Sequence, residues 1–511
     1  MVDVKAYVVV FVLTLFLEQS KCSQVVVHAN VGDIAGNTER VVADDKSKVI
    51  TLFTNIPYAE STAGPNRFLK PIPKAPFKET YQAVGNPVGC FQSSKAATQR
   101  LSSKINFTDD CLILNIYVPH DFTQNTSLPV MIWIYGGAFV EGASGLYRPD
   151  VMVALTDVIV VTVNYRLGMF GFLRSNDGKL PGNQGLWDQH LAIKWVHENI
   201  ASFTGDNKQV TIFGESAGSA SVLYQALYPG NQGYFQRVIA ESGSPLADWA
   251  LLLEPNADLY FAKMNCESSS DPEACLRAKT SEQLQIPRIA TDPLKFAPLL
   301  DGDFIPESAH DILFGNTVNP KSIASRTFYS SLDILTGVNN YDGALYMVSV
   351  WPYVLHYSDI NNPHITRQQL NDVYKGIVEN TLHVKDNKTA EMLREMIEFE
   401  YTNWTDPSSF LSTRVSLLNI SSDVGFFFPA ISAAQGHVAS NGRGKTYFYE
   451  FSYEPVKHII VMPTWIHGAN HADELDYVFG KPLLYNSGFN DDAKSVARSM
   501  IMLWTNFAKS G

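Results

Sequence analysis

The residues Val210-Thr211-Ile212-Phe213-Gly214-Glu215-Ser216-Ala217-Gly218 predict an apolar strand that turns sharply into a helix. A nucleophilic serine on such a strained turn needs a glycine on each side, because side chains there would collide with the flanking strand and helix. The turn would raise the Ser216 hydroxyl above the sheet, and the helix N-terminus would favour negative charge that develops there. The pentapeptide G-x-S-x-G alone is a weak signal. Its place between strand and helix makes Ser216 the candidate nucleophile.

A second segment of the same kind lies upstream. Val130–Tyr135 is an apolar run that leads into Gly136-Gly137-Ala138-Phe139. Small residues after a strand leave backbone N–H groups uncovered, as a site for an oxyanion requires. An ordinary tight turn would explain this segment equally well without Ser216. With Ser216, the amides of Gly137, Ala138 and Ala217 are the candidate oxyanion donors.

Short β-branched runs alternate with helical patterns along the chain, which is typical of βαβ units and a mostly parallel sheet in an α/β fold. A continuous apolar run such as VIVVTV suits a strand that is buried on both faces. The expected strands are Val130–Tyr135, Val158–Asn164, Val210–Phe213, Arg237–Glu241, Asp333–Thr336 and Tyr447–Phe451. Helices with one buried face are expected around Trp187, Leu191 and Trp195, and around Val496, Met500, Leu503 and Trp504.

Composition excludes several classes of protein. The chain has 511 residues, of which 45% are hydrophobic and 18% charged, so it can form a large core and is not of the disordered type. Its formal charge is −12, and an acidic surface repels phosphate backbones, so we expect no nucleic-acid partner. No internal repeat or linker-like tract interrupts residues 23–511, which we expect to form one domain. The stretch Ser358–Asn403 is more polar and predicts a helical cap or insertion.

The N-terminus predicts export. Residues 6–17 form an apolar run behind Lys5 that is shorter than the ~20 residues needed to cross a bilayer. With Ser20 and Cys22 after it, the run is typical of a signal peptide over residues 1–22, and a buried N-terminal strand is the alternative. We therefore expect a secreted protein without a transmembrane segment in its mature chain.

Four cysteines remain after such cleavage, an even number that suits an oxidising compartment. They allow three pairings, of which the two short loops, Cys90–Cys111 and Cys266–Cys275, are favoured. Neither pair has metal-ligand spacing, and we expect no metal. Secretion would turn five sequons into glycan sites, at Asn106, Asn125, Asn387, Asn403 and Asn419.

A series of segments in order resembles the type-B carboxylesterases, the α/β-hydrolase family that includes cholinesterases and bile-salt-activated lipases. The segments are FTNIPYAE, DDCLILNI, NYRLGMFGFL, LPGNQGLWDQHLAIKW, SFTGDNKQVTIFGESAG, LLDGDFIPES and YVFGKP. The resemblance covers nearly everything after the signal peptide. MIWIYGGAF, DGDFIP, HADELDYVFGKP and WTNFAKSG are most similar to the bile-salt-activated lipase branch. The resemblance implies an α/β-hydrolase fold, with a large, mostly parallel central sheet flanked by helices.

The resemblance also implies a catalytic triad. The family's acid lies in a G-x-N-x-x-[DE]-G setting, which places it at Asp342, and its histidine lies nine residues before the glycine of V-F-G, which places it at His471. The nearby His467 is off this spacing and is expected to be solvated or structural. The order Ser216, Asp342, His471 is that of α/β-hydrolases. The implied activity is hydrolysis of acylglycerol, cholesteryl or small carboxyl esters through an acyl-enzyme on Ser216, with no cofactor.

Two rival functions come from the same family. Cholinesterases carry a tryptophan in the first disulfide loop, whereas residues 91–110 contain Phe91 and Phe107 but no tryptophan. Non-catalytic adhesion relatives have lost a triad member, whereas this chain has all three. Bile salts or a lipid interface are further candidate partners.

The chain departs from the family in four places. Thr204, Ile113 and Thr54-Asn55 differ from the usual residues, glycine being common at the first and the last of these sites. The chain also stops at WTNFAKSG where relatives continue, which predicts a truncated C-terminus.

Overall fold

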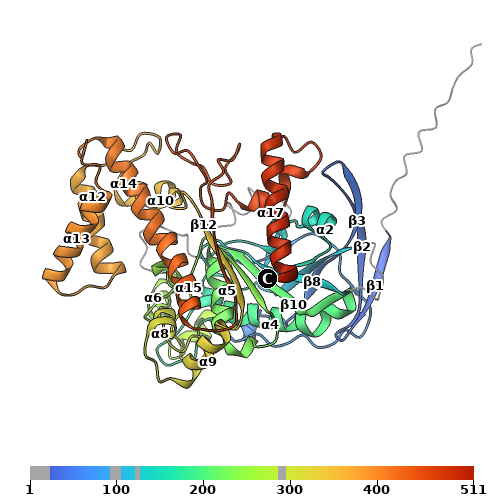
Figure 1. Ribbon diagram of the computed structural model, residues 1–511. Helices are drawn as coiled ribbons and strands as arrows, with labels where there is room; N and C mark the ends of the chain where they lie inside the picture. Colours follow the sequence, from blue (N-terminus) through green and yellow to red (C-terminus); the bar gives the residue numbers. More distant parts are fainter. Residues whose placement is uncertain (1–22, 93–104, 121–126, 286–294) are drawn as a thin grey trace, which may run out of the picture.

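The computed structural model describes residues 23–92, 105–120, 127–285 and 295–511 (Figure 1). The expected signal peptide and the sequon at Asn125 lie outside the described residues. The sequon residues Asn106, Asn387, Asn403 and Asn419 are all exposed. A glycan on any of these four would meet no packed core.

One large mixed sheet forms the centre of the molecule, in the strand order β1-β2-β3-β7-β9-β8-β10-β11-β12-β13, with β4 added beside β2. The six strands from β9 to β13 along this order run parallel to one another, whereas β1, β2, β3 and β7 pair antiparallel. The strands are β1 Gln24–Ala29, β2 Gly32–Ala43, β3 Lys46–Pro57, β4 Tyr81–Gln82, β7 Ile113–Pro119, β8 Leu128–Ile134, β9 Ile159–Val163, β10 Gly205–Glu215, β11 Arg237–Glu241, β12 Asp333–Asn339 and β13 Thr446–Phe451. A separate pair is formed by β5 Val88–Cys90 and β6 Asn106–Thr108.

The predicted parallel sheet is confirmed: each of the six expected strands coincides with one of the parallel strands β8 to β13. The antiparallel strands had no comparable signal, because β1 to β3 are half-exposed and mix polar with apolar residues. β7 is fully buried, yet Asn115 interrupts its apolar run. The side-chain amide of Asn115 is satisfied by the Thr162 and Ser144 hydroxyl oxygens at 3.0 and 3.2 Å.

Helices cover both faces of the sheet. Neighbouring residues of β10 point to opposite faces: a β-carbon added to Gly214 would lie 2.7 Å from Gly218 in α5, whereas the Phe213 ring packs 6.2 Å from the Phe479 ring. The helices of the α/β core are α2 Asp150–Thr156, α3 Gly168–Phe172, α4 Gln184–Asn199, α5 Ala217–Leu227, α6 Ala257–Lys263, α7 Pro272–Ala278, α8 Ala309–Phe314, α9 Pro320–Tyr329, α16 Leu475–Val478 and α17 Asp491–Ser510.

α4 and α17 confirm the two helices expected from sequence. In α17, Met500 and Trp504 are buried as expected, but Leu503 is 60% exposed, so its assignment to the buried face was wrong. Leu503 precedes Trp504 by one residue, which is about 100° around the helix, and that offset carries its side chain to solvent.

A group of helices lies to one side of the sheet in Figure 1, around the expected cap segment. These are α10 Ala344–Ser349, α11 Trp351–Val354, α12 Arg367–Gly376, the π-turn η6 Ile377–Thr381, α13 Asn387–Tyr401, α14 Phe410–Ser422, the π-turn η7 Asp423–Phe427 and α15 Phe428–Ala439. Within the described residues, the continuous helical stretch Phe410–Ala439 alone is long and apolar enough to span a membrane. It packs on β12 and β13 through α15, which is typical of a core helix.

Backbone conformation explains why glycine is common at two of the positions where this chain departs from the family pattern. Thr204 has a φ of 67° and Asn55 a φ of 58°, a left-handed conformation that glycine adopts without strain. The sheet connection at Thr204 is retained all the same, because its carbonyl accepts the amide of Leu128 at 2.9 Å.

Candidate active site

Ser216 lies at the turn between β10 and α5. Its backbone has φ 58° and ψ −122°, a conformation that costs energy for any residue with a side chain. Its amide donates to the Glu241 carbonyl on β11 at 2.8 Å, and its carbonyl accepts the amide of Ala220 at 3.0 Å. Glu215 and Ala217 are buried, whereas Ser216 is partly exposed. The turn therefore presents the serine hydroxyl outward from a fixed backbone.

Glycines surround this turn because nothing larger fits. A β-carbon on Gly214 would lie 2.5 Å from the Ile134 carbonyl oxygen, and one on Gly218 would overlap the same oxygen. A β-carbon on Gly243 would overlap the Ser216 carbonyl. The neighbouring strand β8 is thus the reason that only glycine fits at positions 214 and 218, on the two sides of the serine. The Ser216 carbonyl imposes the same limit on Gly243, in the turn after β11.

The expected oxyanion donors lie beside Ser216. A β-carbon on Gly136 would be 2.9 Å from the Ser216 β-carbon, so the loop after β8 runs directly past the serine. Gly137 and Ala138 have φ values of 111° and 52°, and both are partly exposed. Among the described residues, the amides of Gly137, Ala138 and Ala217 donate to no other group. Three free N–H groups next to one hydroxyl can bind a developing negative charge.

Asp342 and His471 form a buried pair. His471 Nδ1 lies 2.8 Å from Asp342 Oδ1, and the other carboxylate oxygen, Oδ2, accepts from the amide of Asn339 and from the Ser242 hydroxyl at 2.8 Å each. A carboxylate at Nδ1 leaves the proton of a neutral imidazole on Nδ1 and the lone pair on Nε2. The pair thus presents a base at Nε2.

His471 Nε2 has no hydrogen-bond partner among the described residues, and no hydrogen bond joins it to Ser216. Its nearest acidic neighbour is Glu215, whose Oε1 is 3.1 Å away. Burial, together with the charges of Asp342 and Glu241, raises the pKa of Glu215 well above its usual range. The structure therefore joins two of the three expected triad members directly and holds the third in the adjoining turn.

Two further buried carboxyl groups lie close by. Glu241 accepts from the Trp504 indole at 2.9 Å, and burial raises its pKa to about 8. Glu474 accepts from the Asn339 side chain, and burial with neighbouring carboxylates raises its pKa well above the usual range. The sequence alone predicted no role in this site for either group or for Ser242. The available signal was position: Glu241 is the last residue of β11, Ser242 follows it, and Glu474 lies three residues after His471.

Aromatic side chains also lie close to the histidine. The Phe426 ring lies 4.6 Å from the His471 ring, and Trp249 packs against both Phe426 and Phe139. The Trp249 indole donates to the Gly425 carbonyl at 2.9 Å. These apolar surfaces suit an acyl or alkyl group better than a charged one.

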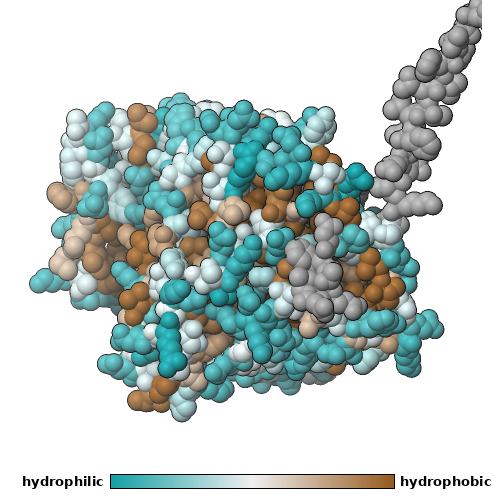
Figure 2. Space-filling view, turned by 45° about the vertical axis from the view of Figure 1, so that its right-hand side comes forward, coloured by the Kyte–Doolittle hydropathy of each residue, from teal (hydrophilic) through white to brown (hydrophobic). Residues whose placement is uncertain are grey.

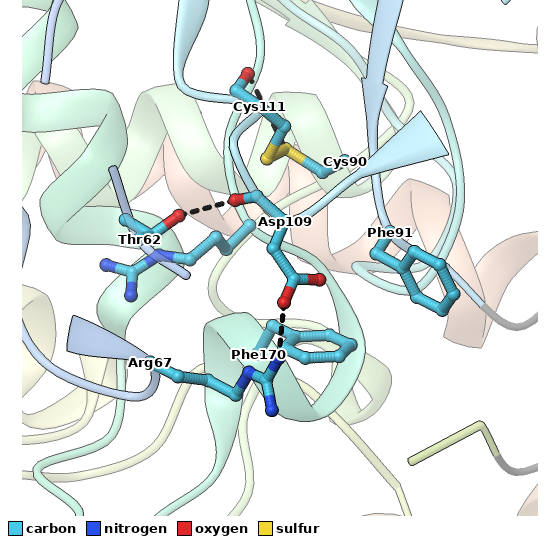
Figure 3. A pocket seen from close by; sticks show the side chains of 8 residues that line it. Thr62, Arg67, Cys90, Phe91, Asp109, Cys111 and Phe170 are labelled. Carbon is cyan, nitrogen blue, oxygen red and sulfur yellow. Dashed lines mark hydrogen bonds and ion pairs between the residues drawn. A yellow bond between two sulfur atoms is a disulfide. The ribbon is translucent and has the colours of Figure 1, made fainter. Parts of the chain in front are cut away.

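The remaining expected residues lie apart from this centre. His467 is exposed and 3.2 Å from Glu454, in keeping with a solvated histidine. The disulfides are Cys90–Cys111 and Cys266–Cys275. Beside the first is a small cavity with Phe91 and Phe170 in its wall and a 2.5 Å ion pair between Arg67 and Asp109 (Figure 3). Among the described residues, no cluster of His, Cys, Asp and Glu is arranged to hold a metal.

Comparison with known proteins gives a family match. The model of the carboxylesterase family matches residues 23–511. The medium-chain fatty acyl-CoA hydrolase precursor of Anas platyrhynchos is 32% identical, over 96% of this chain and 85% of the relative. Bile salt-activated lipase of Bos taurus is 34% identical, over 90% of this chain and 75% of the relative. Neuroligin-2 of Mus musculus is 30% identical, over 90% of this chain and 57% of the relative.

Proposed function

This chain belongs to the carboxylesterase family, and from that membership we propose that it is a serine carboxylic ester hydrolase whose nucleophile is Ser216. The observation that carries the proposal is the buried Asp342–His471 pair, 2.8 Å apart, with an unoccupied Nε2 beside the strained turn that bears Ser216. The proposed triad is Ser216, Asp342 and His471. The proposed oxyanion donors are the amides of Gly137, Ala138 and Ala217.

In the proposed reaction, His471 Nε2 takes the hydroxyl proton as Ser216 Oγ attacks the ester carbonyl. Asp342 stabilises the imidazolium through Nδ1, and the three amides bind the oxyanion of the tetrahedral intermediate. The imidazolium then gives its proton to the leaving alcohol, and an acyl-enzyme remains. Water, activated by the same histidine, releases the acid and restores Ser216.

We propose esters with apolar acyl groups as the substrates, because the partly exposed Trp249 packs against Phe426, the ring that contacts His471, and so brings apolar surface to the edge of the site. Acylglycerols, cholesteryl esters and small esters all satisfy this chemistry. A relative named bile salt-activated lipase supports bile salts or a lipid interface as further partners. Met392, Met396 and Phe399 are exposed and recur at helical spacing on α13, so they form an apolar row that could meet a lipid surface. Figure 2 shows that brown hydrophobic patches interrupt the hydrophilic surface on the face in view.

We also propose that the protein is secreted and glycosylated. Two disulfides support an oxidising compartment. The proposed glycan sites are Asn106, Asn125, Asn387, Asn403 and Asn419, preceded by a signal peptide over residues 1–22. Recovery of the protein from the culture medium tests secretion, and digestion of that protein with an N-glycosidase, followed by mass spectrometry, tests glycosylation.

Hydrolysis of p-nitrophenyl butyrate and palmitate, with and without bile salt, tests the activity and its substrate class. The wild type should be active, and Ser216→Ala should lose at least ~10³-fold of kcat. The ratio of the two rates separates an esterase from a lipase. Inactivity of a folded wild type on both esters would contradict the proposal.

A non-catalytic binding function is the second candidate, favoured by neuroligin-2 among the relatives, whose name denotes no hydrolase. It requires a partner that binds wild type and Ser216→Ala equally well. An acetylcholine hydrolase is disfavoured because the loop between Cys90 and Cys111 has no tryptophan to bind a quaternary ammonium group.

A further inference from the structure

Phe426 makes the main aromatic contact to His471. The two ring centroids are 4.6 Å apart at an interplanar angle of 40°, and both side chains are almost completely buried. Phe426 comes from the helical stretch beside the sheet, whereas His471 comes from the loop that follows β13. The ring that packs on the imidazole therefore belongs to a helical stretch that carries no triad residue.

The π-turn η7, Asp423–Phe427, sets the position of Phe426. This segment is a single turn of π-helix within a longer helix. Such turns widen the helix locally and are frequent at functional sites. Three contacts fix this one: the Tyr401 hydroxyl donates to Asp423 at 2.5 Å, the Trp249 indole donates to the Gly425 carbonyl at 2.9 Å, and Tyr346 packs so close to Gly425 that a β-carbon there would lie 2.7 Å from its ring. The turn that carries Phe426 is thus held on both sides of Gly425 by packed and hydrogen-bonded neighbours.

The imidazole has two possible partners at Nε2. The productive one is the Ser216 hydroxyl. The competing one is the Glu215 carboxyl, whose Oε1 already lies 3.1 Å from Nε2 without forming a hydrogen bond. A small rotation of the ring toward Glu215 would complete that bond and withdraw the base from the serine. The Phe426 ring lies against the imidazole and opposes such a rotation.

We propose that Phe426 is a positioning residue that keeps the His471 imidazole directed at Ser216 and prevents its capture by Glu215. This inference rests on the proposed ester hydrolase function. Phe426 itself takes no proton and forms no bond with the ester. Its removal should lower kcat, because the base is misdirected, and should change KM much less.

The test is a double-mutant cycle on p-nitrophenyl butyrate. Phe426→Ala should lower kcat by roughly 10–100-fold, the loss typical of a misplaced catalytic group, with KM within about threefold of wild type. Phe426→Leu, which keeps apolar bulk, should recover part of kcat. In a Glu215→Ala background, where the competing carboxyl is absent, Phe426→Ala should lower kcat by less than about threefold.

Phe328→Ala is the matched control, since Phe328 in α9 is a buried ring that packs on Phe235, just before the first residue of β11 and so at the opposite end of that strand from the turn at Ser242. It should lower thermal stability and leave kcat within about twofold. An equal loss of kcat on Phe426→Ala with and without Glu215 would overturn the inference, as would an unchanged kcat. Inactive wild type would instead contradict the proposed function.

Discussion

Ser242 donates a 2.8 Å hydrogen bond to Asp342 Oδ2, although the two residues are 100 positions apart in the chain. The bond is possible because β11 and β12 are adjacent parallel strands, and the amide of Ser242 also donates to the Gly337 carbonyl at 2.8 Å. One residue earlier, the Glu241 carbonyl accepts the amide of Ser216. A single turn after β11 therefore holds both the proposed nucleophile and the proposed acid.

Ser242→Ala should reduce kcat by roughly 3–30-fold, because Asp342 loses one of its two donors at Oδ2 and orients His471 less firmly. KM for p-nitrophenyl butyrate should change little. Ser244→Ala is the control, since this buried hydroxyl accepts the amide of Leu246 and, within the described part of the chain, forms no hydrogen bond with a triad residue. Equal kcat values for Ser242→Ala and wild type would refute the positioning role of Ser242.

Gly218→Ala should prevent correct folding of the turn or destabilise the protein by more than about 3 kcal/mol, since its β-carbon would overlap the Ile134 carbonyl. Gly376→Ala provides the contrast. Gly376 lies at the end of α12 with only Asn380 within reach, at 3.9 Å, so alanine there should be neutral or stabilise by about 0.4–1 kcal/mol. Chemical denaturation of both variants measures the difference. Comparable stability for the two would contradict the packing described at the serine.

Thr204→Gly should stabilise the protein by about 0.5–1 kcal/mol. Thr204 is β-branched at a φ of 67°, and its buried hydroxyl has no hydrogen-bond partner among the described residues. Glycine removes that strain, although it makes the unfolded chain more flexible. Urea denaturation provides the measurement, and a loss of stability would show that the Thr204 side chain contributes packing that outweighs its strain.

Glu241→Gln should become more stable relative to wild type as the pH rises. Burial raises the pKa of Glu241 from 4.5 to about 8, so the folded protein binds this proton more tightly than the unfolded chain does. The resulting stabilisation of the wild type is complete below about pH 4.5 and is lost as the pH rises toward 8. Because glutamine does not titrate, the difference in unfolding free energy should shift by about 3–5 kcal/mol between pH 5 and 8.5. A difference that is constant across this range would mean that Glu241 is ionised in the folded protein throughout.

The parallel half of the fold could be predicted from sequence because its strands are buried on both faces and read as continuous apolar runs, as in Ile159–Val163. The antiparallel half could not, because strands such as β2 are half-exposed and alternate weakly. Ser216 and the glycines around it could also be predicted, because the steric demands of the turn are local and leave a pattern in consecutive residues. Asp342 and His471 depended on the family resemblance, because a loop carboxylate and a loop histidine have no local signature.

The contacts that support the proposed triad were beyond prediction. Ser242 reaches Asp342, and Phe426 reaches His471, only through the three-dimensional arrangement of β11, β12 and the helical stretch Phe410–Ala439. Glu215 stands next to Ser216 in the sequence, but its 3.1 Å approach to His471 Nε2 depends on the same arrangement. No spacing rule connects residues that are brought together by separate strands and helices.

The central claim is that Ser216 is the nucleophile, and covalent labelling tests it most directly. The protein would be reacted with a fluorophosphonate, and intact-mass measurement and peptide mapping would locate the adduct. We expect one adduct per chain, on the peptide that contains Ser216, with ester hydrolysis lost in proportion to labelling and no adduct on Ser216→Ala. Hydrolysis that persists after complete labelling, or in Ser216→Ala, would contradict the account.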